Sequence, residues 1–227
     1  MKLLLIQPKT TKIFLNTSLF VITLLLPQCN TKTSVNHYIS GKKRDSGVVK
    51  SGLQEGKWIG WFKNGKIEYV GNYLDGKRTN EWCWYYETGT PRTKIEYKNG
   101  LPNGHFISFH FNGNVWKEGD YSMGIPINSW DIRDTSGKIK EVQPFVNGKT
   151  NGEVKKFFLD GQIRKIITYV NDTMDGVYKE FYQDGKLKMV AMIKDGKLMA
   201  RRDFNENGGV DSAYVGPSVN VIKLDSI

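Results

Sequence analysis

The sequence is poor in the residues that build catalytic and metal centres. Its 227 residues include three histidines and two cysteines. It contains no Gly-x-Ser-x-Gly, His-Glu-x-x-His or Cys-x-x-Cys motif. His105 and His110 are an odd number of residues apart, so on a strand they point to opposite faces and do not share a metal ion. We therefore predict no catalytic residue, no cofactor and no metal site, which favours a protein that is not an enzyme.

The chain also lacks a hydrophobic run long enough to span a bilayer. The apolar stretch at residues 13–26 follows three lysines and is shorter than the roughly 20 residues that a transmembrane helix needs. This pattern predicts an export signal over residues 1–29. The signal ends in Leu26-Pro27-Gln28-Cys29, which resembles a bacterial lipobox, with Gln28 in place of the usual small residue. We expect a lipid on Cys29 and a location at the cell envelope, on its periplasmic or surface face; the alternatives are an ordinary secretory signal and an incidental cysteine.

Positive charge is concentrated near the N-terminus. The formal net charge is +10, but the first 50 residues carry eight bases and one acid. Removing them from the totals of 33 and 23 leaves 25 bases and 22 acids in residues 51–227. This near balance argues against a nucleic-acid partner. Residues 30–51 are polar and basic, and we predict that they form a flexible tether.

Glycine recurs with a period of 24 residues. One series places Gly at 52, 76, 100, 124, 148 and 196, with Asp172 as the exception. A second series contains Gly65, Gly89, Gly113, Gly137, Gly161, Gly185 and Gly209. Such spacing indicates a tandem array in which each unit buries its apolar side against its neighbours. We predict six repeats over residues 52–199, then a partial seventh repeat and a C-terminal cap over 200–227.

Each unit has the signature of a β-hairpin. Asn64-Gly65 and Asp160-Gly161 lie between apolar runs, and such dipeptides favour a two-residue type I′ turn because both residues adopt positive φ. This turn pairs Trp58 with Gly71, where glycine would make room for the ring across the strand. The predicted fold is all-β: an elongated single-layer antiparallel meander of hairpins. Its packed face in the first unit would hold Trp58, Phe62, Ile67 and Tyr73.

The unit also matches a known repeat pattern. It begins Gly-x-Trp or Gly-x-Phe, continues with an aromatic pair and Asn-Gly-Lys, and ends in Tyr-x-x-Gly. Residues 56–67 (GKWIGWFKNGKI) and 176–187 (GVYKEFYQDGKL) show it most fully. Over residues 52–199 the array resembles the MORN repeat in its bacterial variant form. The resemblance implies stacked hairpins and a binding role. It also implies a link to the YwqK-family antitoxins of toxin–antitoxin systems, with a toxin as partner.

The opposite face holds the candidate binding residues. The predicted register places Trp61 across from Glu68, and in three later units it places a ring across from a cation. Those pairs are Tyr85 with Arg92, Phe157 with Arg164, and Phe181 with Lys188. They could form cation–π contacts, or the basic stems could simply shield the rings from water. We predict a partner-binding row made of Trp61, Tyr85, Arg92, Phe109, Trp116, Phe157 and Arg164.

Two regions depart from the repeat. In residues 124–147, Arg133-Asp134 replaces the aromatic pair and Gln143-Pro144 is expected to interrupt the second strand, which predicts weaker packing and a bend, or simple drift. Residues 203–211 resemble the start of a calcium loop, but Tyr214 occupies the position of the bidentate glutamate. We favour a shortened hairpin turn at Asn207-Gly208. Residues 218–224 alternate like a closing strand.

Together these features predict an exported, lipid-anchored protein-binding scaffold whose partner is a protein, such as a toxin. The alternative is a membrane-associated module that binds anionic lipid through the array and its basic tether.

Overall fold

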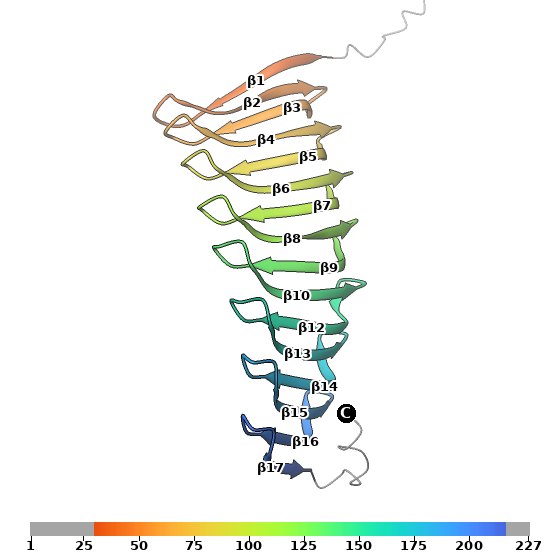
Figure 1. Ribbon diagram of the computed structural model, residues 1–227. Helices are drawn as coiled ribbons and strands as arrows, with labels where there is room; N and C mark the ends of the chain where they lie inside the picture. The colour runs from red at the N-terminus through yellow and green to blue at the C-terminus, as the bar shows by residue number, and fades with distance from the viewer. Residues whose placement is uncertain (1–29, 217–227) are drawn as a thin grey trace, which may run out of the picture.

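The computed structural model describes residues 30–216. Within this range the chain forms seventeen strands and no helix, in a single sheet. Consecutive strands pair antiparallel, except that the short β11 and β12 are successive parts of one divided strand and both pair with β10. The predicted all-β single-layer meander is confirmed (Figure 1). The export signal, Cys29 and the predicted closing strand at 218–224 lie outside the described residues. The strands are β1 Thr31–His37, β2 Lys43–Lys50, β3 Leu53–Trp61, β4 Ile67–Leu74, β5 Lys77–Tyr85, β6 Pro91–Lys98, β7 Leu101–Phe109, β8 Val115–Ser122, β9 Ile125–Arg133, β10 Ile139–Val146, β11 Lys149–Thr150, β12 Gly152–Phe157, β13 Ile163–Val170, β14 Thr173–Phe181, β15 Leu187–Lys194, β16 Lys197–Phe204 and β17 Val210–Val215.

The two long sides of the sheet, where successive strands are connected, carry different turns. On the edge drawn at the left of Figure 1, the N–H of Phe62 donates to the Lys66 carbonyl (2.8 Å) and that of Gly65 to the Phe62 carbonyl (2.9 Å). Gly65 has φ +86°, so this is a three-residue loop with a glycine bulge. We call this side the loop edge. On the other side, the tight-turn edge, Asp75 (φ +49°) and Gly76 (φ +74°) form the type I′ turn.

The type I′ prediction at Asn64-Gly65 is therefore wrong. In the loop only Gly65 needs positive φ, and the side-chain oxygen of Asn64 accepts a hydrogen bond from the Lys66 N–H instead (2.9 Å). Asn-Gly favours both turn types. The type I′ turns belong to the other glycine series, where both turn residues have positive φ.

The bulge changes the register beside each loop. Trp58 pairs with Gly71 as predicted, but the register shifts between Gly60 and Trp61, so Trp61 pairs with Ile67 and not with Glu68. Ile67 therefore leaves the predicted packed face and lies across from Trp61. The shift recurs along the array and pairs Tyr85 with Pro91, Phe109 with Val115, Phe157 with Ile163, and Phe181 with Leu187.

Residues 30–51 do not form a tether. They form β1 and β2, and β2 continues the sheet into β3. The connecting loop has the same form as the later ones: the N–H of Tyr38 donates to the Lys42 carbonyl, and that of Gly41 to the Tyr38 carbonyl. Gly41 lies 24 residues before Gly65, so the period extends one unit further than predicted. The polar composition was misleading because an edge hairpin exposes most of its side chains.

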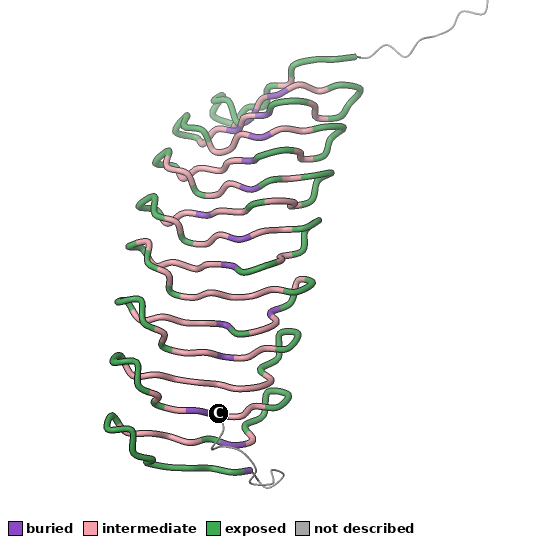
Figure 2. The backbone as a smooth tube through the Cα atoms, turned by 45° about the vertical axis from the view of Figure 1, so that its right-hand side comes forward, coloured by how far each residue is buried: buried purple, intermediate pink, exposed green. Residues whose placement is uncertain are grey.

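The core is a stripe along the middle of one face, which we call the ring face because it carries Trp58 and Trp82 (Figure 2). Trp82 is 1% exposed and lies flat on Gly71, where an added Cβ would come 2.1 Å from the indole. The prediction that Gly71 accommodates Trp58 of its own hairpin is thus corrected, because the ring on it comes from the next hairpin. We call this stripe the inner column. In chain order its positions are Gly47, Trp58, Gly71, Trp82, Ile95, Phe106, Gly119, Trp130, Gln143, Val154, Ile167, Tyr178 and Ala191.

The unit at 124–147 forms the same hairpin, with local defects. β10 is continuous through Pro144, which corrects the predicted interruption. The following strand is the divided one, since β11 and β12 separate at Asn151. Within residues 30–216, Trp130 Nε1 is the buried side-chain polar atom with no hydrogen-bond partner, whereas Trp82 Nε1 donates to the Asn72 carbonyl (3.1 Å). The predicted bend stays a prediction.

Candidate functional site

The predicted contact row lies beside the loop edge. Trp61, Tyr85, Phe109 and Phe157 are half-buried, whereas Arg92, Trp116 and Arg164 are exposed. The predicted ring–cation pairs do not face one another, because the bulge moves the cation out of register. Tyr85 faces Pro91, and Lys188 Nζ lies 5.7 Å from the ring centre of Tyr182, not over Phe181.

The β7–β8 hairpin carries the most exposed aromatic rings of the described residues, one in its loop and one near the start of β8. Phe111 is 64% exposed and Trp116 is 49% exposed. Phe111 leans against Tyr86 of the preceding loop, with ring centres 5.3 Å apart, and Trp116 lies 6.1 Å from the ring centre of His110. We call Phe111 and Trp116 the exposed ring pair. Sequence reasoning missed Phe111, although an apolar residue at a loop tip was a usable signal.

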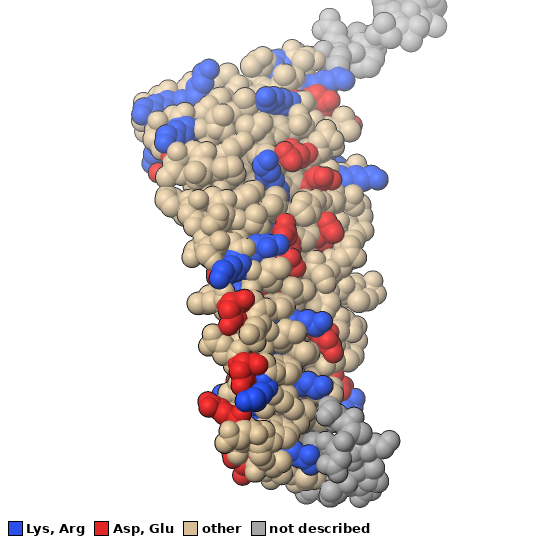
Figure 3. Space-filling view, viewed as in Figure 1, with Lys and Arg blue, Asp and Glu red and all other residues tan. Residues whose placement is uncertain are grey.

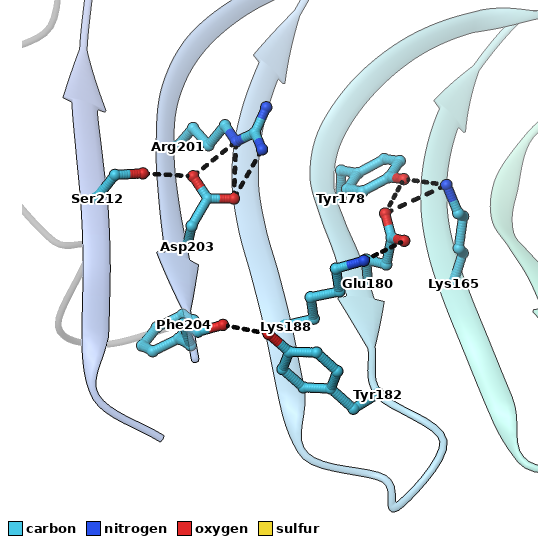
Figure 4. Close-up of polar contacts among 9 residues, drawn as sticks. All are labelled: Lys165, Tyr178, Glu180, Tyr182, Lys188, Arg201, Asp203, Phe204 and Ser212. Carbon is cyan, nitrogen blue, oxygen red and sulfur yellow. Dashed lines mark hydrogen bonds and ion pairs between the residues drawn. The ribbon is translucent and has the colours of Figure 1, made fainter. Parts of the chain in front are cut away.

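Hydrogen bonds tie successive loops together. The Tyr38 hydroxyl donates to the Trp61 carbonyl (2.8 Å), and the Tyr86 hydroxyl donates to that of Phe109 (2.8 Å). The Tyr182 hydroxyl repeats this contact with the Phe204 carbonyl (2.8 Å; Figure 4). The loop edge is thus held in place before any partner binds, which reduces the entropy lost on binding.

The N-terminal half of the ring face holds an aromatic cluster around one guanidinium. Trp82 packs on Tyr69, Tyr73, Trp84 and Tyr97, with ring centres 4.9–6.3 Å apart. Arg78 Cζ lies 4.7 Å from the Trp82 ring centre, and Nη1 donates to the Tyr97 hydroxyl (3.4 Å). Burial, followed by the nearby Asp45 charge, raises the pKa of Tyr69 to about 12. We call the six residues from Tyr69 to Tyr97 the Arg78 cluster: Tyr69, Tyr73, Arg78, Trp82, Trp84 and Tyr97.

The C-terminal half of the same face holds an ionic network instead (Figure 4). Lys165 Nζ donates to the Tyr178 hydroxyl (2.8 Å), which donates to Glu180 Oε2 (3.1 Å). Burial opposes ionisation of Glu180, but hydrogen bonds from Lys165 and Tyr178 outweigh it and hold its pKa below its ordinary value. Asp203, bound by Arg201 on two oxygens, also has a lowered pKa, chiefly because of those hydrogen bonds.

The tight-turn edge carries a second apolar feature. Its turn-flanking residues are mostly aliphatic or basic. The exposed aliphatic ones are Leu53, Leu74, Leu101, Ile125, Val146, Val170 and Leu198, and the basic ones are Lys50, Lys77, Lys98, Lys149, Lys194 and Lys197.

Histidines and acids do not assemble into a metal centre in the part of the chain that the structure describes. His105 Nδ1 lies 3.2 Å from Asp120, whereas His110 Nε2 contacts the Arg133 carbonyl. The calcium-like stretch forms the β16–β17 loop, in which the Asn205 N–H donates to the Gly209 carbonyl and the Gly208 N–H to the Asn205 carbonyl. The predicted turn is confirmed.

Cys83 is a free thiol on the face opposite the ring face. Burial, together with a hydrogen bond to Glu81, raises its pKa to about 11. It is therefore almost entirely protonated at neutral pH and is a poor nucleophile.

On the side seen in Figure 3, lysines and arginines gather at the upper left, beside the loop edge of the N-terminal strands. Further along the sheet, bases and acids are mixed.

The fold and these surfaces define a single-layer hairpin repeat protein. Five segments match the family model of the MORN repeat variant, and together they cover just under half of the chain. Between the matched segments one unit is left out, near residues 126–147, and it contains Pro144. No curated protein gives a significant match. No helix among residues 30–216 is long and apolar enough to cross a bilayer. The matched segments are 54–75, 78–99, 102–123, 150–171 and 174–195.

Proposed function

We propose that this protein is a non-enzymatic protein-binding scaffold, exported and anchored at the cell envelope by a lipid on Cys29. The exposed ring pair carries the proposal. Phe111 and Trp116 project from a preorganised loop edge and expose much of their apolar surface. Large rings of this kind supply much of the binding energy in protein interfaces. The rest of the predicted row, with its half-buried rings and the exposed Arg92 and Arg164, would form the rim.

The test is affinity capture from an envelope extract with three forms of the protein. Phe111→Ser with Trp116→Ser removes the exposed ring pair, and Leu53→Ser with Leu74→Ser changes two exposed apolar residues on the other edge. We expect the first pair to abolish capture and the second to leave it intact. Equal capture by all three forms would refute this binding surface. Mass spectrometry of the same sample shows whether Cys29 carries lipid.

The repeat family suggests a toxin as the partner, and export requires such a toxin to act in the envelope. Under this proposal, the captured protein should inhibit growth when it is exported alone, and coexpression of the scaffold should relieve that inhibition. A captured protein that is harmless when exported alone would exclude the antitoxin role without affecting the scaffold.

A second candidate function, binding of anionic lipid, is favoured by the tight-turn edge. Its aliphatic side chains could enter a membrane surface while its lysines meet headgroups at about 1 kcal/mol each. Protein without the acyl group should then bind anionic vesicles at low salt and release them at high salt. Leu53→Ser with Leu74→Ser should weaken that binding, whereas removal of the exposed ring pair should not.

A further inference from the structure

Arg78 differs from the cations on the C-terminal half of the ring face. In the C-terminal half each has a carboxylate from its own or an adjacent strand: Lys156 lies 3.1 Å from Glu141, Lys165 lies 3.2 Å from Glu180, and Arg201 lies 2.7 Å from Asp203. Within residues 30–216 no acid forms an ion pair with Arg78, whose polar partners are the hydroxyls of Tyr73 and Tyr97.

Some positions of the ring face carry charged residues in the C-terminal half but uncharged residues around Arg78. They form a second line on the ring face, the outer column, in which each residue is the cross-strand partner of the next. Around the Arg78 cluster its members are rings and hydroxyls, and further along they become mostly ionic. In order they are Tyr69, Trp84, Thr93, Ser108, Lys117, Ile132, Glu141, Lys156, Lys165 and Glu180.

The cluster is built to receive an anion. The Arg78 guanidinium lies over the Trp82 ring, and the residue as a whole is half-buried. A planar guanidinium presents five N–H donors and matches a carboxylate with two parallel hydrogen bonds. The Tyr97 hydroxyl accepts from Arg78 and keeps its own proton to donate. Trp84 offers an apolar ring beside them, 5.4 Å from Arg78 Cζ.

We propose that the Arg78 cluster is a subsite for a carboxylate of the partner protein, from an Asp or Glu side chain or a chain terminus. A single cation neutralises one unit of charge, which suits a carboxylate better than a phosphate dianion. The bound carboxylate would complete on this half of the face the pairing that Glu180 and Asp203 complete on the other. The assignment deepens the proposed scaffold function, since it gives the chemistry of a second point of contact.

The experiment titrates the isotope-labelled full chain with benzoate and with benzamide, its neutral analogue of the same shape. The indole N–H resonances of Trp82 and Trp84 report binding. Benzoate should shift them in a saturable manner, and benzamide should bind about tenfold more weakly or not at all, because it lacks the charge-assisted pair. Equal shifts with both probes would overturn the assignment, without any variant being needed.

Variants then locate the site. Arg78→Gln should lower benzoate affinity about tenfold. Tyr97→Phe should lower it about threefold. This second variant keeps the aromatic packing, so it remains informative if Arg78→Gln disturbs the fold. Lys156→Gln is the matched control, because that cation is already paired with Glu141, and it should change nothing. Unchanged affinity in both cluster variants would refute the proposal. Tighter binding of glucuronate than of benzoate would refute a protein source for the carboxylate.

Failure here is separable from failure of the scaffold function. If benzoate does not bind but envelope capture still depends on Phe111 and Trp116, the subsite is wrong and the scaffold stands. If benzoate binds as described but no protein is captured, the subsite is real and the scaffold proposal falls.

Discussion

The two halves of the ring face use one backbone register for different chemistry. At matching positions, Tyr69, Trp82 and Trp84 stack as rings in the N-terminal half, whereas Lys165, Tyr178 and Glu180 form an ionic network in the C-terminal half. Strand pairing is the same in both. The repeat therefore specifies the sheet through its turns and leaves the content of the face free to vary.

The two solutions differ in how much stability they offer. Rings that lie flat on glycine remove apolar area from water at about 25 cal/mol per Å². Partly exposed ion pairs contribute about 0–1 kcal/mol each, because solvent screens them and ordering long side chains costs entropy. The N-terminal half should therefore be the more stable one, with less sensitivity to pH.

The largest effect should come from truncating the central ring. We expect Trp82→Ala to lower the free energy of unfolding by about 3–5 kcal/mol, because it opens a cavity under four other rings. Tyr178→Ala, in the same column, should cost less than half of that. Urea denaturation followed by circular dichroism measures both, and equal losses would end the distinction between the halves.

A glycine substitution tests the interlock itself. Gly71→Ala places a Cβ into the Trp82 indole and should cost about 1–3 kcal/mol through overpacking. Adding it to Trp82→Ala should cost much less, since the ring is then gone. The matching position in the C-terminal half holds Ile167, which precedes Tyr178 in the inner column. Additive losses in the double mutant would show that the glycine is needed for some other reason.

The unit at residues 124–147, which contains Trp130, offers a finer comparison within the N-terminal half. Trp82→Phe breaks the hydrogen bond to Asn72, whereas Trp130→Phe removes a buried N–H that has no partner. An unsatisfied buried donor costs about 1–3 kcal/mol, so Trp130→Phe should be the milder change by about 1 kcal/mol. Thermal melts of the two variants test this order. A larger loss of melting temperature for Trp130→Phe than for Trp82→Phe would contradict it and would indicate that Trp130 has an acceptor in solution.

The smallest effect should be a response to acid confined to the C-terminal half. The pKa values of Glu180 and Asp203 are lowered by folding, so their stabilisation is complete above the ordinary carboxyl range and is lost as pH falls through the folded values. Amide exchange protection should then fall more in β14–β17 than in β4–β6 below about pH 4. Glu180→Gln should remove part of this difference. A uniform loss of protection would contradict it.

Much of the fold was accessible from the sequence because glycine marks the turns. The 24-residue period gave the hairpins, and the Asn64-Gly65 dipeptide gave the register of Trp58 with Gly71. The turn type was not accessible, because a two-residue loop and a three-residue loop with a bulge produce the same pairing away from the turn. One bulge residue decides whether Trp61 faces Glu68 or Ile67.

The candidate site was harder to predict because its residues meet across hairpins. The predicted register was wrong beside each loop, so Tyr85 does not face Arg92 and Phe157 does not face Arg164. The guanidinium that does lie over a ring is that of Arg78, above Trp82. Both residues belong to one strand, on either side of a backbone kink at Asn80 (φ +56°). Side-chain alternation alone does not reveal this contact. Phe111 was not predicted because it lies in a loop, where the alternation of side chains along a strand does not apply.

Trp58, Trp82 and Trp130 each lie on a glycine of the hairpin before. This arrangement makes the array directional, so its units are not interchangeable. Removing residues 72–95 would bring Phe106 onto Gly71, with a smaller ring over the glycine. Removing residues 72–119, two whole units, would bring Trp130 there and restore a glycine–tryptophan contact. The shorter protein should therefore melt at the higher temperature of the two, and such arrays should gain and lose hairpins more readily in pairs than singly.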